Sequence, residues 1–318
     1  MKISIVGGGL SGIFAARALL ERGHQPTIIE KSRSVGGRLA TKSIGGGRAD
    51  HGAQFFTVRS EILQKLTDEW LEQRWIKHWF GEDFPRYSSI DGMRALTEKL
   101  AKDLGVVLEE RVVDIESAGS QGVTLMTDRG QKISSDAAIL TPPVPETLEL
   151  LVGSQLTLSH ETKETLSKIS FNPGFVGLLM LKEPFAVGEA GIISENLPDG
   201  IDKIIANDQK GISASPILTV YMTGDWSAER FDSTDEAVIK EILHILSPHV
   251  LSQEQVQTSQ LSRWHCAEAK HVYKKPYLQL DNHPIYLAGD CFLTENDSSG
   301  RTRIESAILS GISVGKGL

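Results

Sequence analysis

Cysteine is scarce in this chain. Of its 318 residues only Cys266 and Cys291 are cysteines, and no CxxC pair occurs. Two isolated cysteines argue against a disulfide-stapled secreted scaffold and favour reduced thiols in a cytoplasmic protein. The nine histidines form no HxxxH pair, and none stands at metal-ligand spacing with a cysteine. The sequence therefore predicts no metal site.

Long apolar runs and an excess of basic residues are also missing. No apolar stretch approaches the length of a transmembrane helix, and the apolar N-terminus runs directly into a glycine loop, unlike a signal peptide. The net charge of −8 argues against nucleic-acid and anionic-membrane partners. With 40% hydrophobic and 23% charged residues, the composition is that of a globular protein long enough for two domains. It leaves the oligomeric state open.

The strongest motif occupies residues 2–30. Ile3, Ile5 and Val6 form a short β-branched run that predicts a buried strand. The run ends at GGGLSG, residues 7–12, which fits the pattern G-x-G-x-x-G. Residues 13–22 then have helical spacing of apolar positions, and a second strand-like run ends on Glu30. The order of strand, glycine turn, helix, strand and acid predicts a βαβ dinucleotide-binding unit.

Each residue of this motif has a chemical reason. Gly7 allows a tight turn, Gly9 lets backbone approach a pyrophosphate, and Gly12 lets helix and strand pack closely. Amides at the helix start, including that of Ser11, can hold the negative charge. Glu30 can accept a hydrogen bond from a ribose 2′-hydroxyl. The alternative is a glycine turn without a ligand, and the motif alone does not separate FAD from NAD.

Two further stretches follow the acid. Lys31 begins a loop that reaches Gly36, Gly37 and Arg38, where a guanidinium could lie on a phosphate. The alternative for this loop is a surface turn with a solvated arginine. Residues 49–57, ADHGAQFFT, then combine small residues with two aromatics, which suggests backbone close to a flat ligand.

The stretches GGGLSG, GGRLAT and ADHGAQFFT resemble the flavin amine-oxidase superfamily, and most closely its short renalase-like branch. In that family the equivalents of Arg38, Gln54 and Phe55 touch FAD, and the equivalent of Val112 lies against its adenine. Near the C-terminus, residues 284–290 read as a strand that ends in Gly289-Asp290. The resemblance implies that this aspartate binds the ribityl chain and that the helix from about residue 303 meets the flavin pyrimidine.

The resemblance and the motifs together predict non-covalent FAD, because no side chain for covalent attachment is identifiable and Cys291 is the one exception considered. The predicted cofactor-binding residues are Gly7, Gly9, Ser11, Gly12, Glu30, Lys31, Gly37, Arg38, Gln54, Phe55, Val112, Gly289, Asp290, Ile304 and Glu305.

The middle of the chain changes character after the proline cluster at residues 141–145, which we interpret as a crossing between domains. Candidate strands follow at 175–181, 203–206, 217–222 and 256–265, with a capped helix beginning near Thr234. Few crossovers between them imply a mostly antiparallel sheet. Earlier in the chain, residues 61–79 have a helical pattern.

We therefore predict an α/β protein with a discontinuous Rossmann-like FAD-binding domain and an inserted α+β substrate domain. The first comprises residues 1–56, 88–145 and 271–318, and the second residues 57–87 and 146–270.

Catalytic side chains are harder to identify from the sequence than the cofactor-binding residues. No Ser-His-Asp or paired-carboxylate arrangement is present, so the chemistry would be carried by the flavin. Gln54, Trp264 and His265 are candidates to face it, with packing at a domain interface as the alternative for the last two. His51 is interpreted as structuring its loop rather than as a base.

The resemblance implies hydride transfer from a small substrate to flavin N5, followed by reoxidation with O₂ to give H₂O₂. Renalase-like proteins oxidise off-pathway dihydronicotinamides, which makes 2- or 6-dihydro-NAD(P) the favoured substrate. An amine oxidase or a desaturase is the enzymatic alternative. An alternative of another class is a flavin- or nucleotide-binding protein without turnover.

Overall fold

The computed structural model describes residues 1–247, 250–297 and 299–318, and the chain folds into two compact units. The first comprises residues 1–37, 97–171 and 269–318, and the second residues 38–96 and 172–268. The predicted boundary near residue 270 lies within two residues of this division. The predicted boundaries at 56, 88 and 145 do not.

The proline cluster is not where the chain leaves the first unit. It leads into α4 (Val144–Gly153) and α5 (His160–Ser167), and Leu151 and Leu166 from these helices are fully buried in the core of that unit. Pro143 is the N-cap of α4 and Pro145 lies in its first turn, where a missing amide hydrogen costs no helical hydrogen bond. The prolines therefore begin a helix here, and the chain crosses after Phe171.

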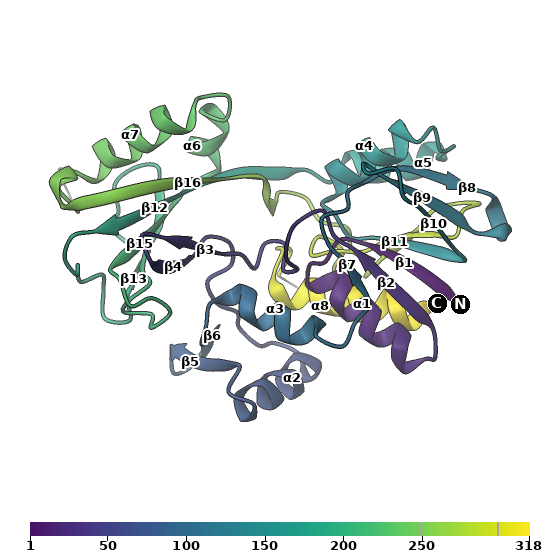
Figure 1. Ribbon diagram of the computed structural model, residues 1–318, viewed down its shortest axis with the longest axis horizontal. Coiled ribbons are helices and arrows are strands. Elements are labelled where there is room, and N and C mark those ends of the chain that lie inside the picture. The colour runs from purple at the N-terminus through teal and green to yellow at the C-terminus, as the bar shows by residue number, and fades with distance from the viewer. Residues whose placement is uncertain (248–249, 298) are drawn as a thin grey trace. The chain divides into compact units, whose positions relative to one another are not determined.

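The first unit is built on a six-stranded sheet with the order β17-β18-β11-β1-β2-β7 (Figure 1). Its five strands from β18 to β7 are parallel to one another, and the short edge strand β17 is antiparallel to β18. The strands are β1 (Lys2–Val6), β2 (Gln25–Ile29), β7 (Val106–Val107), β11 (Ala137–Leu140), β17 (Leu278–Gln279) and β18 (Ile285–Leu287). The predicted βαβ opening and the strand before Gly289 are both present.

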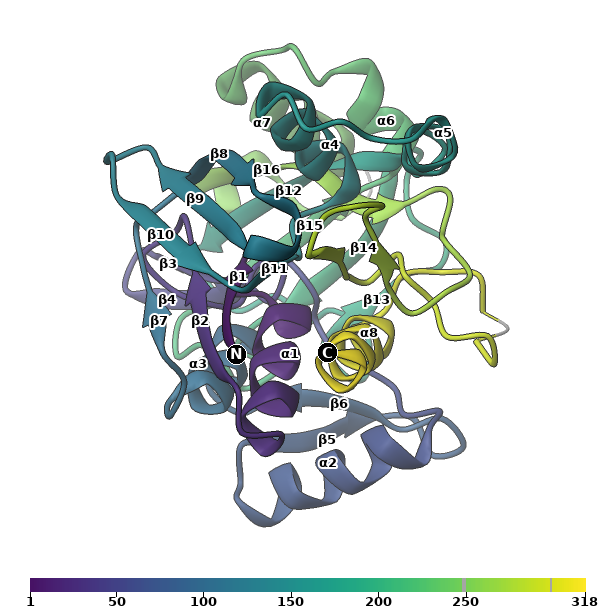
Figure 2. The same ribbon diagram turned by 90° about the vertical axis from the view of Figure 1, so that its right-hand side faces the viewer.

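One face of this sheet carries two helices that lie side by side, α1 (Leu10–Glu21) and α8 (Ile304–Gly317) (Figure 2). They approach closely because α8 presents glycines to α1. A Cβ added at Gly311 would lie 2.3 Å from the carbonyl oxygen of Ser11, and one at Gly315 would lie 2.8 Å from that of Ala15. Since both sequences increase together along the contact, the two helices run parallel.

The opposite face carries an antiparallel sheet of the strands β8 (Val112–Ser117), β9 (Val123–Thr127) and β10 (Lys132–Ser135), with the 3-10 turn η1 (Gly119–Gln121). Strands β9 and β10 form a hairpin, and Gly130 in its turn has φ 78°. Val123 and Leu125 bury their side chains in one core with Leu140 of the parallel sheet.

The second unit contains a five-stranded sheet with the order β13-β14-β15-β12-β16. The predicted strands occur as β12 (Phe171–Leu181), β14 (Ile201–Ala206), β15 (Ile217–Met222) and β16 (Val256–Ala269), and β13 (Ile192–Ile193) adds a short edge. The pairs β13–β14, β14–β15 and β12–β15 are antiparallel, as expected from the few crossovers. Helices α6 (Gly224–Glu229) and α7 (Asp235–Leu246) pack on one face, and the 3-10 turn η2 (Gln253–Gln255) precedes β16.

The other face of this sheet meets a hairpin formed by β3 (Thr41–Ile44) and β4 (Gly47–Asp50), through a small core that includes Ile44, Ala49 and Ile217. A second hairpin, β5 (Ile76–Phe80) and β6 (Arg86–Ser89), follows α2 (Glu61–Glu72). Helix α3 (Met93–Ala101) runs from the second unit into the first.

The predicted helix over residues 61–79 is too long. Helix α2 ends at Glu72, and Arg74 adopts φ 56°, a left-handed conformation that turns the chain into β5. The predicted helix extended past this point because Trp75 and Trp79 continue the helical spacing of apolar residues. Trp70 belongs to α2 and is buried, whereas Trp79 belongs to strand β5.

The close contact between α1 and α8 leads to a stability prediction. Gly311→Ala should lower the free energy of unfolding by about 1–3 kcal/mol, because the new methyl group has no room against the Ser11 carbonyl. Gly153→Ala is the matched control, since a Cβ there, at the end of α4, meets nothing within 4 Å. Urea unfolding followed by circular dichroism measures both. Equal stability of the two variants would contradict the close packing.

Candidate functional site

The glycine loop between β1 and α1 has the geometry of a phosphate-binding turn. Gly7 adopts φ 103°, and its amide donates to the carbonyl of Ile29 over 2.9 Å. A Cβ at Gly12 would lie 2.1 Å from the carbonyl oxygen of Gly7, so only glycine permits this approach of helix and turn. The turn thereby brings the start of α1 directly over the end of β1.

The start of α1 can accept an anion. A Cβ at Gly9 would meet nothing within 4 Å, so the backbone there faces space that protein atoms do not fill. Ser11 is 5% exposed, and among the described residues its hydroxyl oxygen has no hydrogen-bond partner. The first amides of a helix also lack partners within the helix and carry its positive dipole end. These features fit the pyrophosphate of a dinucleotide.

Glu30 lies beside this loop at the end of β2. Its carboxylate accepts hydrogen bonds from the amides of Gly8 (2.7 Å) and Ser32 (2.8 Å) and is 6% exposed. Each oxygen keeps a second lone pair, which can accept from a ribose hydroxyl. The following loop lies against the glycine turn, since the amide of Gly36 donates to the carbonyl of Gly8 over 2.8 Å.

Gly37 completes this arrangement. It adopts φ 55°, and a Cβ there would lie 3.5 Å from the Cα of Gly9. Lys31 forms a surface ion pair, in which its ammonium lies 2.7 Å from the carboxylate of Glu146. Val112 is buried at the start of β8, with 8% of its surface exposed. The roles predicted for Lys31 and Val112 toward the cofactor stay predictions.

The C-terminal part of the predicted set lies on the same unit. Gly289 is buried and donates its amide to the hydroxyl of Ser310 in α8 over 2.9 Å. Asp290 is the next residue, shortly after the end of β18 at Leu287. Because α8 is parallel to α1 and Gly311 is level with Ser11, Ile304 lies about 10 Å further along the axis at 1.5 Å per residue. The two helix starts therefore suit two distant parts of one extended ligand.

Arg303, at the N-cap of α8, was not singled out by any motif. Its guanidinium pairs with Asp297 over 2.7 Å, and its backbone amide donates to the hydroxyl of Ser306 over 2.8 Å. Burial opposes the charge on Asp297, but hydrogen bonds from Ser299 and Arg303 together lower its pKa. This cluster fixes the start of α8, close to the predicted contacts of Ile304 and Glu305.

In the second unit the predicted residues Gln54 and Phe55 belong to the segment 50–55, whose backbone is irregular after β4. This segment is held by a lysine that sequence reasoning missed. Lys210 is fully buried, and its ammonium donates to the Asp50 carboxylate (2.7 Å), to the Gln54 carbonyl (2.8 Å) and to the Gln54 side-chain oxygen (2.7 Å). Burial lowers the pKa of Lys210, which the charge of Asp50 opposes.

The side-chain amide of Gln54 has no hydrogen-bond donor left for a ligand. Its side-chain nitrogen donates to the Asp50 carbonyl and to the Tyr221 hydroxyl, and its oxygen accepts from Lys210. Tyr221 in turn donates to the Gly52 carbonyl over 2.6 Å, and burial raises the pKa of its phenol, which keeps it protonated. The structure thus favours Gln54 as an anchor of the segment over a residue that reacts with substrate.

His51 and Trp264 form a stacked pair. Their ring centroids lie 5.4 Å apart, and the Trp264 indole donates to the His51 carbonyl over 2.9 Å. Burial, with the positive charges of Lys42 and Arg94 and against the opposing charge of Asp50, lowers the pKa of His51 to about 4. The imidazole is therefore neutral at physiological pH.

His265 does not share this position with Trp264. Its ring packs edge-on against Phe231 at 4.7 Å, on the side of α6 and α7, because successive side chains of a strand point to opposite faces. The two residues therefore do not line one common wall, and only Trp264 lies beside the segment 50–55.

Phe55 and Phe56 also point apart. Phe56 is buried against Trp70, whereas Phe55 is half-buried in a group with Trp79 and Phe80, at centroid distances of 6.0 and 5.6 Å. Arg38, the first residue of this unit, donates to the Ala267 carbonyl over 3.3 Å. Its contact with FAD stays a prediction, as do those of Gln54 and Phe55.

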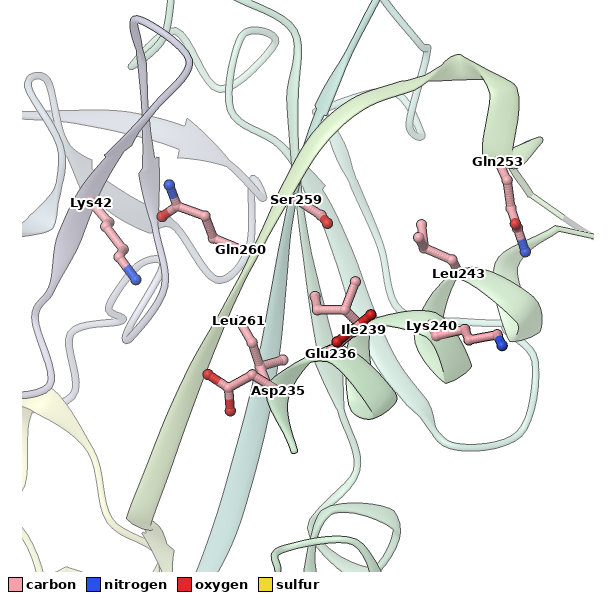
Figure 3. A pocket seen from close by; sticks show the side chains of 10 residues that line it. All are labelled: Lys42, Asp235, Glu236, Ile239, Lys240, Leu243, Gln253, Ser259, Gln260 and Leu261. Atoms are coloured by element: carbon pink, nitrogen blue, oxygen red, sulfur yellow. The ribbon is translucent and has the colours of Figure 1, made fainter. Parts of the chain in front are cut away.

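A cavity of about 610 Å³ lies elsewhere in the second unit, beside α7 and β16 (Figure 3). Its walls include Asp235, Lys240 and Gln260, together with Lys42, and no residue of the predicted site lines it. Asp235 is already paired with Arg263 over 2.7 Å. Within the described part of the chain, no group of three or more histidine, cysteine or acidic residues is placed to hold a metal ion.

The buried pair of Lys210 and Asp50 leads to a second prediction. Lys210→Met should destabilise the protein by about 3–5 kcal/mol, because it leaves the Asp50 carboxylate buried without its countercharge. Adding Asp50→Asn should restore most of the loss, since the amide oxygen can still accept from Thr41 and from the Met93 amide. Thermal unfolding of the single and double variants checks this. No recovery in the double variant would contradict it.

Comparison with known proteins agrees with this geometry. A family model described as flavin containing amine oxidoreductase matches residues 64–315, and one for an NAD(P)-binding Rossmann-like domain matches residues 5–70. A 1-hydroxycarotenoid 3,4-desaturase from Flavobacterium sp. (strain P99-3) is 34% identical over 90 residues, which cover 26% of this chain and 18% of that protein. A 4,4′-diapophytoene desaturase from Staphylococcus aureus (strain MRSA252) is 26% identical over 135 residues, or 40% of this chain and 25% of that one.

The chain thus spans a quarter or less of the length of these curated relatives. Among solved structures, wild-type putrescine oxidase bound to putrescine superimposes with a TM-score of 0.68 at 16% identity, over 100% of this chain and 99% of that one. This likeness confirms the predicted fold class. The predicted enzyme class, an FAD-dependent oxidoreductase, is that of the matched family. With that family model covering most of its length, the chain belongs to the flavin-containing amine oxidoreductases.

Proposed function

We propose that the protein is a renalase-like oxidase with non-covalent FAD that takes a hydride from an off-pathway dihydronicotinamide, 2- or 6-dihydro-NAD(P), and passes the electrons to O₂ to form H₂O₂. When bound, FAD supplies the hydride acceptor. The chain's own residues bind and orient the reactants and keep water away.

The residues of the first unit are suited to hold FAD. The amides at the start of α1, with Gly9 and Ser11, would receive the pyrophosphate, and Glu30 would accept from a ribose hydroxyl. Asp290 and the start of α8 would serve the ribityl chain and the pyrimidine ring. Cys291 is 2% exposed in the core of this unit, which supports non-covalent binding.

The observation that carries the choice of substrate is the neutralisation of Asp50. It is the only acidic residue in residues 50–56, and its carboxylate is fully buried against Lys210. No carboxylate of this segment therefore remains to pair with a protonated amine. Burial is the main cause of the low pKa of His51, and the positive charges of Lys42 and Arg94 add to it. Positive charge near His51 disfavours a cation and suits a neutral ring that carries anionic phosphates.

The chemistry of such a substrate agrees with a site that lacks a charged base. A dihydronicotinamide that loses a hydride becomes an aromatic pyridinium, and no proton has to leave with it. An ammonium substrate, in contrast, must first lose a proton to a base. The half-buried aromatic group of Phe55, Trp79 and Phe80 offers ring surface for a flat substrate.

A desaturase is the second candidate, favoured by the partial match to carotenoid desaturases. An amine oxidase and a flavin-binding protein without turnover are the remaining alternatives. No helix among the described residues has the length and apolar character to cross a membrane. Substrate-dependent H₂O₂ release separates an enzyme from a binder, and the identity of the reductant separates the enzymes.

The substrate proposal predicts which compounds bleach the flavin. Purified protein should be yellow and release intact FAD on acid precipitation. Mixed without oxygen, 2- and 6-dihydronicotinamide nucleotides should bleach its visible absorbance quickly, and the ordinary 4-dihydro form slowly, because its hydride is on another ring carbon. Stopped-flow absorbance measures the rates. Fast bleaching by primary or secondary amines alone would move the assignment to the amine oxidases.

The cofactor proposal predicts a role for Glu30. Glu30→Ala should weaken FAD binding by about 1.5–3 kcal/mol for each hydrogen bond lost from the carboxylate. Glu21→Ala, at the exposed end of α1, is the control and should bind FAD like the wild type. Fluorescence titration of the apoprotein measures the dissociation constants. Unchanged affinity in the Glu30 variant would remove this residue from the site.

A further inference from the structure

The ion pair of Lys210 and Asp50 requires an explanation other than stability. Both side chains are fully buried. Removing two charges from water costs several kcal/mol for each ion, and their mutual attraction recovers this only with very good geometry. Replacing a buried ion pair with apolar side chains of similar size is often neutral or stabilising. What an apolar side chain cannot do is fix hydrogen-bond acceptors at defined positions.

Lys210 does so for a segment that forms no regular strand after Asp50 and is otherwise held by single hydrogen bonds, among them those from Tyr221 and Trp264 to its carbonyls. Between residues 51 and 59 the backbone forms one isolated bridge, from Phe56 to Tyr87, and the amides of His51 and Ala53 donate to the carbonyls of Ala40 and Arg38. The ammonium has three N–H donors, and all three are used on this segment, at Asp50 and at two oxygens of Gln54. The lysine therefore joins the two ends of the stretch 50–54, together with the hydrogen bond from the Gln54 side-chain nitrogen to the Asp50 carbonyl.

The same ammonium supports the aromatic group. Its nitrogen lies 4.9 Å from the centroid of the Trp79 ring, a cation–π contact, and Trp79 packs edge-on against Phe55. A second lysine, Lys77 of β5, donates to the Lys210 carbonyl over 2.7 Å. Hairpin β5–β6 thus contacts Lys210 at its ammonium, through Trp79, and at its backbone carbonyl, through Lys77. The segment 50–55 contacts the same ammonium.

We propose that Lys210 is a positioning residue for the flavin: it holds the segment 50–55, and through Trp79 the ring of Phe55, at the place where they contact FAD. The proposal rests on the proposed function and on the FAD contacts that the family resemblance predicts for Gln54 and Phe55. Lys210 touches neither substrate nor cofactor in this role. It acts through Gln54 and Phe55.

The test uses the double variant Lys210→Met with Asp50→Asn, which removes both charges without leaving one buried alone. It should fold with near wild-type thermal stability, yet bind FAD at least tenfold more weakly and show an altered visible circular dichroism spectrum of the bound flavin. The control is Lys168→Met with Glu164→Gln, which removes a solvent-exposed ion pair of 2.7 Å. The control should keep both the wild-type dissociation constant and the wild-type spectrum.

Trp79→Leu provides a second arm that does not depend on the buried pair being replaceable. It breaks the link between the ammonium and Phe55 at a half-buried position, so the flavin spectrum should change in the same direction. A folded double variant with wild-type FAD affinity and spectrum overturns the proposal. If the double variant does not fold, a wild-type spectrum in Trp79→Leu overturns it. Wild-type protein that binds no FAD would instead overturn the proposed function.

Discussion

The first unit depends on a set of contacts that exist only because side chains are missing. Gly12 lets α1 begin in contact with the turn after β1, and Gly311 and Gly315 let α8 lie directly against the other side of α1. The helix is held between backbone on both sides, with no side-chain layer between α1 and α8 at these points. The starts of both helices are consequently fixed relative to the carboxyl ends of the parallel strands, which is where ligands of such sheets bind.

The second unit solves a different problem, the placement of an irregular segment. After Asp50, the last residue of β4, the segment leaves the strand ladder. The amides of His51 and Ala53 donate to backbone carbonyls, and oxygens of the segment accept from Lys210, Tyr221 and Trp264. Burying the lysine is costly, and Asp50 compensates its charge. One consequence is chemical, since the same pairing removes the only carboxylate of the segment from contact with ligands. In the proposed function, the position of the segment and the choice of substrate both depend on this one interaction.

The two kinds of support explain which residues suit which role. Backbone groups and glycines can receive a phosphate without a charged side chain, because amides at a helix start already carry the positive dipole end. A flat, neutral ring needs surface and exact position, which aromatic side chains and a rigid segment supply. The chemistry of the family is carried by the flavin, and the residues of the chain hold and orient the ligands.

Sequence alone determined the features that depend on neighbours along the chain. The βαβ opening, the hairpin around Gly130, the strand before Gly289 and the helix that begins at Ile304 follow from local periodicity, caps and turns. The glycine contacts between α1 and α8 could also be anticipated, because Gly311 and Gly315 are four residues apart on one helical face.

Only the tertiary structure decided the rest. Lys210 lies in a turn 156 residues from Gln54, and nothing in its local sequence distinguishes it from a solvated lysine. Trp264 and His265 are adjacent in the chain, but their side chains lie on opposite faces of strand β16. They therefore cannot line the same side of a site. The proline cluster begins α4 and stays in the first unit because Leu151 has apolar partners there. In each case the outcome depends on contacts between distant parts of the chain, which local patterns do not record.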